Sequence, residues 1–386
     1  MKCDNRVRVA HVITRMIVGG AQETVLLAAA LADRSRFDPV VITGPQTGSE
    51  GSLHEQLQER GVEVRVLPEL VRQVSPVHDL RAVSALARAF RELGADVVHT
   101  NSSKAGIVGR LAARRARVPR VLHTVHGWPF HDHQNLAAAT VWRQLERRAA
   151  RLADRLVVVA DADRTKGLAA GVGRLEQYVT VRSGIELAKY GPDAAVRNQV
   201  RQELGLAADA AVIGAVNRLS PQKDPLSLVR AAAVALRADP CARLLLVGDG
   251  PLRAQVLSEG RALGIADQVL SVGLRRDVSR LLTAVDVFAS ASLWEGLPRT
   301  VLQAMATGVP VVATAADGIV DVVQDGITGL LVPPGHADAL GAALERVLRD
   351  APLGRALADH AAARLPEFDA AVMVRRLERL YAGQSL

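Results

Sequence analysis

Short runs of aliphatic and β-branched residues alternate with longer helical segments along the whole chain, and this alternation constrains the fold more than any other feature. In the first half the runs lie at 7–13, 40–43, 62–67, 96–100, 118–125 and 156–160. Segments with helical spacing lie between them, as at 22–32 and 79–93. The second half repeats the pattern, with runs at 211–216, 243–248, 269–272, 285–290 and 309–313. The alternation predicts an α/β fold of two successive doubly wound parallel sheets, each covered by helices on both faces.

The length of 386 residues also favours two domains rather than one. We place the join near 183–192, where a strand ends in a segment rich in Gly and Pro before a helix at 194–204. The predicted domains are 1–185 and 186–368, with a C-terminal helix at about 369–386 that crosses back to the first domain. Ligands of such sheets bind at the carboxyl ends of the strands, so the cleft between the domains is the natural site.

Composition excludes several classes of protein. The two cysteines, Cys3 and Cys241, lie far apart, which argues against a disulfide framework and fits a reducing compartment. No apolar stretch reaches the ~18–20 residues that span a bilayer, and residues 1–23 lack the apolar block of a signal peptide. Residues 1–185 carry 27 Lys and Arg against 18 Asp and Glu, whereas residues 186–386 carry 21 against 22. The positive charge therefore belongs to the first half, which we expect to face an anionic partner.

The segment SLWEGLPRTVLQAMATGVPVVAT at 292–314 carries the strongest chemical signal. It follows a strand and opens a helix near Pro298, and Gly296 allows a tight turn before the free amides of the helix start. A carboxylate there would repel a phosphate, so Glu295 is better suited to neutral sugar hydroxyls. Gln303, two turns on, can hydrogen-bond another hydroxylated group. The alternative is that Glu295 only favours the helix dipole and Gln303 lies on the surface.

Two further segments in the second half also join a strand to a helix. NRLSPQKDP at 217–225 places Arg218 and Lys223 at the mouth of the sheet, a pair suited to a diphosphate, although two such cations are common on plain surfaces. LLLVGDGPLR at 244–253 ends its strand in Gly248 and Gly250, which would let a ligand approach the backbone. The full dinucleotide fingerprint is missing, so this second signal is weak alone.

Three strand ends in the first half carry candidate groups. Gly19 and Gly20, in IVGGAQE, would let a phosphate or sugar approach the backbone, or simply form a tight turn. The segment HTVHGWPFHDH at 123–133 has four histidines but no zinc spacing, and it places His126 at the sheet edge, where it meets substrate or serves as a core histidine. In HTNSSKAG at 99–106, Ser102 or Ser103 can cap a helix, and Ser103 with Lys104 can hold an acceptor phosphate.

Arginines recur at helical spacing in two segments, Arg110, Arg114 and Arg117 in the first and Arg143, Arg147, Arg151 and Arg155 in the second. Such stripes suit anionic lipid headgroups, while a solvated helix face is the default. Few aromatic side chains accompany these arginines, which argues against nucleic acid as the partner.

In this order and spacing the motifs resemble those of the family 4 glycosyltransferases of the GT-B fold, over nearly the whole chain. The resemblance includes Gly19–Gly20, His126–Gly127, Arg218 with Lys223, the VGDG turn, VGLRRDV at 272–278, the 292–314 segment and DGITGLLVPPG at 325–335. It implies two Rossmann-like domains that face each other across a cleft, the first binding an acceptor and the second a nucleotide sugar.

The resemblance also implies a role for each matching residue. Arg218 and Lys223 would clamp the donor diphosphate and stabilise the leaving nucleotide without a metal or other cofactor. Glu295, with the loop Gly296, Leu297 and Pro298, would contact the transferred sugar, and Leu274 and Arg275 would border the base. Gly20 and His126 would complete the site from the opposite domain. The expected reaction retains anomeric configuration by front-face attack. A UDP-sugar is the expected donor, and a lipid-linked or polysaccharide intermediate at the cytoplasmic membrane face is the expected acceptor.

The sequence departs from the family pattern at three places. Gln303 stands where the family has a second acid, Ser183–Gly184 replaces the usual Asn-Gly, and the later glycine loop reads Gly318-Ile319-Val320-Asp321 with a shorter acid. Gln303 can replace the acid as a hydrogen-bond partner of ribose hydroxyls, but the substitution leaves the identity of the donor nucleotide open. Two rival functions stay open from the sequence: a sugar-nucleotide epimerase or hydrolase on the same fold, and a non-catalytic sugar-nucleotide-binding subunit.

Overall fold

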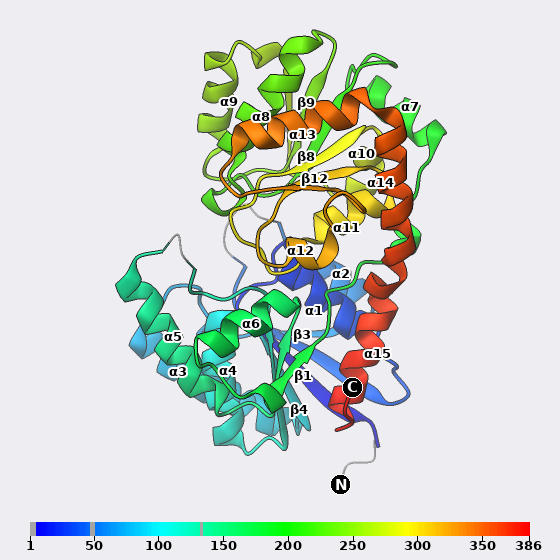
Figure 1. The fold of residues 1–386 in the computed structure, drawn as a ribbon. Helices are drawn as coiled ribbons and strands as arrows, with labels where there is room; N and C mark the ends of the chain where they lie inside the picture. Colours follow the sequence, from blue (N-terminus) through cyan, green and yellow to red (C-terminus); the bar gives the residue numbers. More distant parts are fainter. Residues whose placement is uncertain (1–4, 47–50, 132–133) are drawn as a thin grey trace. The chain divides into compact units, whose positions relative to one another are not determined.

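The computed structural model describes residues 5–46, 51–131 and 134–386. The chain forms two compact units, each described here by itself (Figure 1). Unit 1 contains residues 1–184 and 370–386, and unit 2 contains residues 185–369. The boundaries predicted from the sequence lie at 185/186 and 368/369. None of the helices in the described ranges is long and apolar enough to cross a membrane.

Unit 1 is built on a seven-stranded sheet in the described residues, in the order β3-β2-β1-β4-β5-β6-β7. Every pairing in it is parallel. Because parallel strands with helices on both faces are buried on both sides, they consist of nearly continuous apolar runs, such as VRVAHVI in β1. The strands are β1 (Val7–Ile13), β2 (Phe37–Thr43), β3 (Glu63–Val66), β4 (Val97–Asn101), β5 (Arg120–Val125), β6 (Arg155–Val158) and β7 (Tyr178–Thr180).

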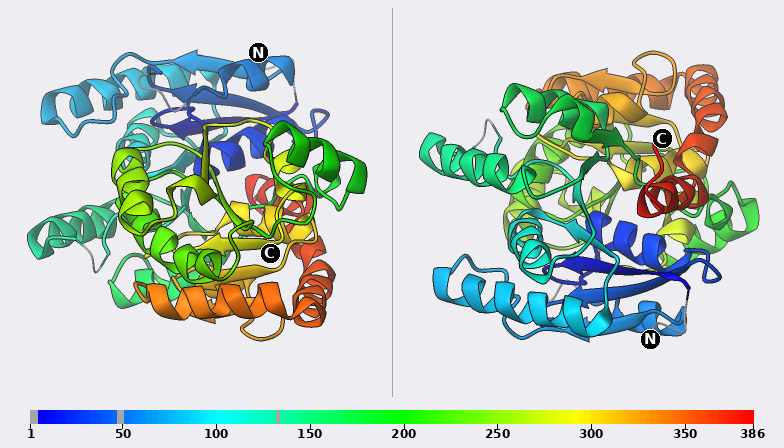
Figure 2. Two further views of the ribbon diagram at one scale, coloured as in Figure 1. Left: turned by 90° about the horizontal axis from the view of Figure 1, so that it is seen from above. Right: turned by 90° about the horizontal axis from the view of Figure 1, so that it is seen from below.

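Helices cover both faces of this sheet and divide its core into layers. The helices α1 and α15 share one apolar cluster with the sheet, and α3 and α4 share another. Viewed from below, α3 lies on one side of the blue strands and α1 and α15 on the other (Figure 2). The helices of unit 1 are α1 (Gly20–Ala30), α2 (His54–Glu59), α3 (Pro76–Leu93), α4 (Ser103–Ala116), α5 (Leu136–Ala150), α6 (Asp161–Ala169) and α15 (Ala370–Tyr381).

The C-terminal helix α15 belongs to unit 1 although it follows unit 2 in the sequence. Its apolar face, which includes Met373, Leu377 and Tyr381, is buried in the same cluster as Val9 of β1 and Val25 of α1. The Tyr381 hydroxyl also hydrogen-bonds His99 Nδ1 of β4 at 2.7 Å. The last helix therefore contributes both apolar and polar contacts to the first sheet.

Unit 2 contains a six-stranded parallel sheet in the order β10-β9-β8-β11-β12-β13. The strands are β8 (Val212–Val216), β9 (Arg243–Val247), β10 (Val269–Gly273), β11 (Val287–Ser290), β12 (Val311–Thr314) and β13 (Leu330–Val332). The edge strand β13 was not among the predicted runs, because its three residues leave no periodic pattern to detect. The two doubly wound parallel sheets confirm the predicted fold class.

The helices of unit 2 also lie in two layers. One apolar cluster includes residues of α7, α10 and α11, and the other includes residues of α8, α9 and α13. The bounds are α7 (Ala194–Glu203), α8 (Pro225–Ala238), α9 (Arg253–Ala262), α10 (Val278–Thr283), α11 (Arg299–Ala306), α12 (Ile319–Val322), α13 (Ala337–Arg349) and α14 (Ala351–Arg364), with a short 3₁₀ helix η3 (Pro221–Lys223) before α8.

Candidate functional site

The candidate site of unit 2 lies where the neighbouring strands β8 and β11 end. Since both strands are parallel, their carboxyl ends meet at one edge of the sheet, and the loops that follow them come together there. Loop 217–223 follows β8 and loop 291–298 follows β11. Two segments about 70 residues apart in the sequence thus form one surface.

Lys223 and Glu295 form an ion pair between these two loops. The Glu295 side chain is 8% exposed and the Lys223 side chain 22% exposed. Ser292, itself 1% exposed, donates its hydroxyl to Glu295 Oε1 at 2.7 Å. A buried carboxylate is costly unless it is paired and hydrogen-bonded, and both of these partners serve that need. Ser292 is not among the residues predicted from the sequence.

Further hydrogen bonds hold the two loops together. The Gln222 side chain donates to the Trp294 carbonyl at 2.9 Å, and the Leu293 amide donates to the Gln222 carbonyl at 2.9 Å. Thr314, at the end of β12, donates its hydroxyl to the Ser292 carbonyl at 2.5 Å. The position of Glu295 is therefore fixed from both neighbouring strand ends.

The helix α11 begins directly after this loop, with Pro298 as its N-cap, as the sequence predicted. Gly296 and Pro298 are buried and Leu297 is half-buried. Gln303 is 7% exposed, which excludes the alternative that it lies on the surface. The start of the helix offers backbone N–H groups without helical partners, a favourable place for an anion.

Arg218 lies in the same loop as Lys223 but is exposed. Between the two residues the chain turns into η3, whose N-terminal cap Ser220 has an extended backbone. The loop thus presents one exposed guanidinium and one half-buried ammonium at the edge of the sheet. A planar guanidinium and a compact ammonium group can together bind a diphosphate.

Gly248 and Gly250 are explained by the packing of the chain itself. A Cβ on Gly248 would lie 1.9 Å from the Asn217 carbonyl oxygen, and one on Gly250 would lie 2.4 Å from the Leu219 carbonyl oxygen. The Gly248 φ of +131° is a further reason for glycine. Both glycines therefore let the turn after β9 pack closely against the loop after β8. Their contact with a donor remains a prediction.

Leu274 and Arg275 follow β10, two strands away from β8 in the sheet order. Leu274 is 46% exposed. The Arg275 guanidinium makes two hydrogen bonds to the Asp277 carboxylate, at 2.8 and 2.6 Å, and these bonds hold the Asp277 pKa below its usual value. The pair keeps Arg275 in place beside the exposed Leu274, an arrangement that can border a flat base.

In unit 1, the predicted His126 lies at the carboxyl edge of the sheet, directly after β5. Its Nε2 lies 3.0 Å from Asn101 Oδ1, at the end of the neighbouring strand β4. Two other histidines of these strands, His99 and His123, are fully buried, and burial holds their pKa values well below the usual range. Both rings are therefore neutral at pH 7, so they serve as hydrogen-bonding core residues.

Gly19 is the N-cap of α1 and Gly20 is its exposed first residue. A Cβ on Gly19 would lie 2.7 Å from the Gln22 side-chain oxygen, which is the end of a flexible side chain and can move away. The Gly19 carbonyl accepts the Glu23 amide at 2.9 Å. The Gly19 φ of 178° is extended, so the backbone of this turn does not itself require glycine. A ligand contact at either glycine remains a prediction.

The predicted capping of α4 by a serine side chain is wrong. Ser102 is the N-cap but makes no side-chain capping bond; its φ is +65° and its hydroxyl instead pairs with Thr14 Oγ1 at 3.2 Å. Ser103 is the first residue of the helix. The Lys104 ammonium pairs with Asp79 at 2.6 Å and is only 9% exposed. This ion pair competes with the predicted role of Lys104 toward an acceptor phosphate.

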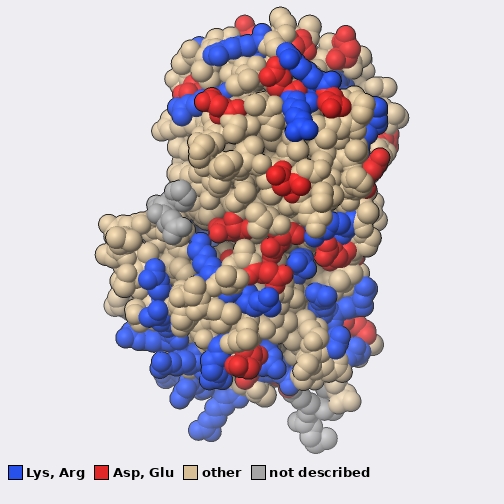
Figure 3. Space-filling model, in the orientation of Figure 1, with Lys and Arg blue, Asp and Glu red and all other residues tan. Residues whose placement is uncertain are grey.

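The two predicted arginine stripes are only partly surface features. On the face shown in Figure 3, Lys and Arg gather over the part of unit 1 that carries α3, α4 and α5. Arg110 of the first stripe does not belong to this surface, because it is fully buried and pairs with Glu146 at 2.7 Å. In the second stripe, Arg147 donates to the Ala170 carbonyl at 2.7 Å. The exposed members are Arg114, Arg117 and Arg151.

Part of the histidine-rich segment, residues 132 and 133, lies outside the described residues. Trp128 and Phe130 from the same segment stack at 5.2 Å in the apolar cluster that also contains Val125. Across 5–46, 51–131 and 134–386, no three His, Cys, Asp or Glu side chains come together as a metal site would require. Independence of metal remains a prediction.

Comparison with known families gives a match to each unit. The model described as "Glycosyl transferases group 1" matches residues 196–364, and the model described as "Glycosyl transferase 4-like domain" matches residues 18–184. The first match falls within unit 2 and the second within unit 1.

Curated relatives match along much of the chain. The UDP-Gal:alpha-D-GlcNAc-diphosphoundecaprenol alpha-1,3-galactosyltransferase of Escherichia coli is 30% identical over 349 residues, which cover 90% of this chain and 89% of that protein. The D-inositol 3-phosphate glycosyltransferase of Actinosynnema mirum is 36% identical over 288 residues, which cover 68% and 67%. Among solved structures, Anabaena HepE in complex with UDP-glucose has a TM-score of 0.85 at 24% identity, covering 98% of this chain and 100% of that one.

Proposed function

This chain belongs to the family 4 glycosyltransferases of the GT-B fold, and on that premise we propose that it transfers a hexose, with retention, from a UDP-sugar to a lipid-linked or polysaccharide acceptor of the cell envelope. One observation carries the donor side of this proposal. The half-buried Lys223 ammonium and the buried Glu295 carboxylate lie together at the strand ends of unit 2, beside the start of α11.

In the proposed site the loops 217–223 and 291–298 bind different parts of the donor. Lys223 and Arg218 bind the diphosphate, because both carry positive charge on the loop after β8. Glu295, which the phosphates would repel, accepts hydrogen bonds from hydroxyls of the sugar. Gln303, buried on α11, hydrogen-bonds ribose hydroxyls in place of the acid common in the family. Leu274 and Arg275 border the base.

The proposed reaction breaks the bond between the sugar C1 and the diphosphate oxygen. The acceptor hydroxyl forms its new bond to C1 on the same face, and its proton passes to the departing phosphate. Negative charge grows on the nucleoside diphosphate as it leaves, and Lys223 and Arg218 stabilise that charge. Because these two cations supply the electrostatic stabilisation, we expect turnover to continue when divalent metal is chelated.

The named relatives support the choice of substrates. The Escherichia coli relative is named for UDP-galactose and for an acceptor linked to diphosphoundecaprenol. We assign acceptor binding to unit 1, with Ser103 and Lys104 as the acceptor-side candidates, and we keep Gly19 and Gly20 as donor-binding residues and His126 as a catalytic residue. We place the protein in the cytoplasm at the inner face of the plasma membrane. The exposed arginines of α4 and α5 suit anionic headgroups there.

The experiment that tests this function follows nucleotide release and lipid products together. The protein is incubated with UDP-glucose, UDP-galactose or UDP-N-acetylglucosamine, with and without a polyprenyl-diphosphate-linked sugar. We expect one donor to add one sugar residue to the lipid, seen by mass spectrometry, with one UDP released per product. The same rate of UDP release without the acceptor would instead indicate a hydrolase, and conversion of the donor into another UDP-sugar without net UDP release would indicate an epimerase.

A further inference from the structure

Asn101 and His126 are brought together by the register of two neighbouring strands. Asn101 is the last residue of β4 and pairs in register with Thr124 of β5. His126 follows Thr124 by two positions, directly after the end of β5. Its Nε2 lies 3.0 Å from Asn101 Oδ1. Asn101 is 1% exposed, so its side-chain amide has little access to water as an alternative partner.

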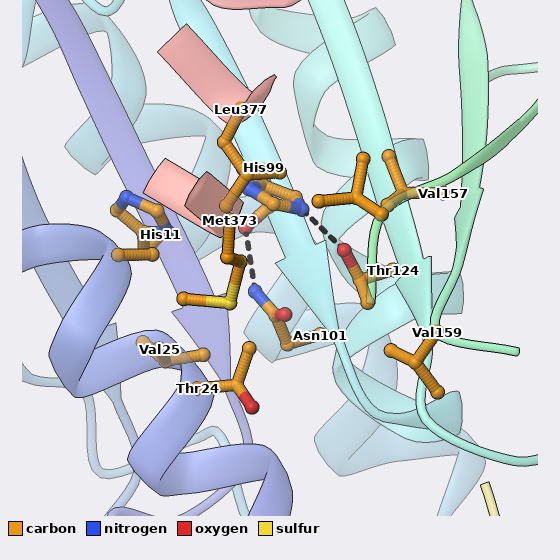
Figure 4. Close-up of a pocket in the computed structure, with 12 residues that line it drawn as sticks. His11, Thr24, Val25, His99, Asn101, Thr124, Val157, Val159, Met373 and Leu377 are labelled. Atoms are coloured by element: carbon orange, nitrogen blue, oxygen red, sulfur yellow. Dashed lines mark hydrogen bonds between the residues drawn. The ribbon is translucent and has the colours of Figure 1, made fainter. Parts of the chain in front are cut away.

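The orientation of the Asn101 amide is fixed by its second contact. Its Nδ2 donates to the backbone carbonyl of His99 at 3.2 Å, the lower dashed line of Figure 4. A carbonyl oxygen can only accept a hydrogen bond, so the amide nitrogen must face His99 and the amide oxygen must face His126. The oxygen in turn can only accept, so the His126 ring nitrogen opposite must carry a proton.

We propose that Asn101 is a positioning residue that holds a proton of His126 on Nε2, so that the lone pair of the neutral ring lies on Nδ1. In this form Nδ1 acts as a hydrogen-bond acceptor, suited to a sugar hydroxyl but not to a phosphate oxygen. This use of Nδ1 toward a hydroxyl of the donor sugar or the acceptor rests on the proposed function. The assignment of the tautomer rests on the geometry alone.

The histidines beside His126 on β4 and β5 are buried and hydrogen-bonded. His99 of β4 is held by the Tyr381 hydroxyl of α15 at 2.7 Å and by the Thr124 hydroxyl at 2.6 Å. His99 and His123 are the titratable groups of β4 and β5 that interact electrostatically with His126, and burial lowers the pKa of both. Neither supplies a charge at pH 7. Arg110 of α4 lies beyond these two histidines. Its charge also lowers the His123 pKa, and its guanidinium forms an ion pair with Glu146.

The tautomer can be measured directly in the full-length protein. The ten histidines are labelled with ¹⁵N, and the ring signals of His126 are assigned by their loss in His126→Gln. In the unsubstituted protein at pH 8 we expect a protonated Nε2 and an unprotonated Nδ1. In Asn101→Leu, which removes the acceptor at similar volume, we expect the two nitrogens to move toward the averaged shifts of a free histidine. A protonated Nδ1 in the unsubstituted protein would overturn the proposal.

A second variant tests the role in turnover. Asn101→Asp keeps an acceptor oxygen opposite Nε2 but adds a negative charge, which favours the doubly protonated His126 ring. We expect kcat to fall at pH 7 and to recover as the pH is raised, with the acid limb displaced upward by about one pH unit or more. Asn101→Leu should lose about tenfold in kcat at all pH values. Identical pH profiles for Asn101→Asp and the unsubstituted protein would contradict the role.

These measurements separate the inference from the proposed function. If the protein transfers no sugar at all, the ¹⁵N signals of His126 still decide whether Asn101 fixes the tautomer. If transfer is observed but the ring signals show a protonated Nδ1, the function stands and the inference fails. Thermal unfolding of both Asn101 variants identifies any loss of activity that comes from misfolding.

Discussion

Lys223 and Glu295 lie 72 residues apart in the sequence and form an ion pair where the neighbouring strands β8 and β11 end. The pairing follows from the parallel sheet, which brings the two loops to the same edge. It also links stability to function, because the ammonium that compensates a buried carboxylate is the one that the donor diphosphate is proposed to contact.

The first prediction concerns that linkage. Lys223→Ala should destabilise unit 2 by about 2 kcal/mol, less than the ~3–5 kcal/mol lost when a fully buried pair is broken, because Lys223 is 22% exposed. Adding Glu295→Gln removes the uncompensated charge and should restore most of that loss. Urea unfolding of the two single variants and the double variant measures the coupling. Strictly additive losses would mean that the pair has no energetic role.

Ser292→Ala should reduce kcat/KM by about tenfold while leaving the fold intact. The substitution removes the hydroxyl that donates to Glu295 Oε1 at 2.7 Å, and a hydrogen bond to a charged group contributes about 1.5–3 kcal/mol. Ser290→Ala is the matched control, since its hydroxyl lies 3.4 Å from the Ser292 hydroxyl and makes no hydrogen bond to Glu295 in the described part of the chain. Equal kinetic losses in the two variants would show that Glu295 does not depend on Ser292.

Arg110 should act on stability and not on membrane binding. Arg110→Met leaves Glu146 buried without its partner and should cost about 3–5 kcal/mol, which a further Glu146→Leu substitution should largely recover. Arg114→Ala, at an exposed position of the same helix, should change stability by less than about 0.5 kcal/mol. Chemical unfolding compares the three variants. Co-sedimentation with anionic vesicles should weaken for Arg114→Ala and stay unchanged for Arg110→Met/Glu146→Leu.

Acid should destabilise unit 1 through His11. This ring is 1% exposed, and neither of its nitrogens has a hydrogen-bond partner among the described residues. Burial, followed by the charge of Arg34, lowers its pKa from 6.5 to about 4. The unfolded chain therefore binds the proton more readily than the folded one, so stability is lost as the pH falls from about 6.5 toward 4.

Between pH 7 and pH 5 the contribution of His11 alone amounts to a loss of about 2 kcal/mol. His11→Leu should remove that part of the pH dependence in urea unfolding experiments. His336→Leu, at an exposed position, should leave the pH dependence unchanged and serves as the control. An unaltered slope in His11→Leu would show that the ring does not titrate as burial requires.

The sequence predicted the fold class because burial on both faces gives parallel strands an unbroken apolar pattern. The bounds of β1 were identical in prediction and structure, and the start of α11 at Pro298 was also predicted. Edge strand β13 escaped detection because three residues carry no period. Family resemblance supplied the roles of the site residues, which periodicity alone does not reveal.

Side-chain partners between distant segments were beyond the reach of the sequence. Arg110 has the same helical spacing as the exposed arginines of its stripe, so its spacing did not show that it is buried and pairs with Glu146. Lys104 likewise looked available for a phosphate, whereas α3 supplies Asp79 as its partner. Ser292 and Asn101 were missed because their importance comes from the residues they touch. Both residues are polar and lie at or next to the end of a strand, beside a strand that carries a predicted site residue. This pattern is the sequence signal that would have identified them.

The most direct test of the central claim is a calorimetric titration of UDP into the unsubstituted protein and Lys223→Ala, with UMP as the control ligand. If Lys223 binds the donor diphosphate, the substitution should weaken UDP binding by about tenfold to a hundredfold, the equivalent of a charge-assisted hydrogen bond of ~1.5–3 kcal/mol. It should affect UMP, which lacks the second phosphate, much less. Equal affinity of the two proteins for UDP would contradict the assignment of the diphosphate to the Lys223 and Glu295 loops.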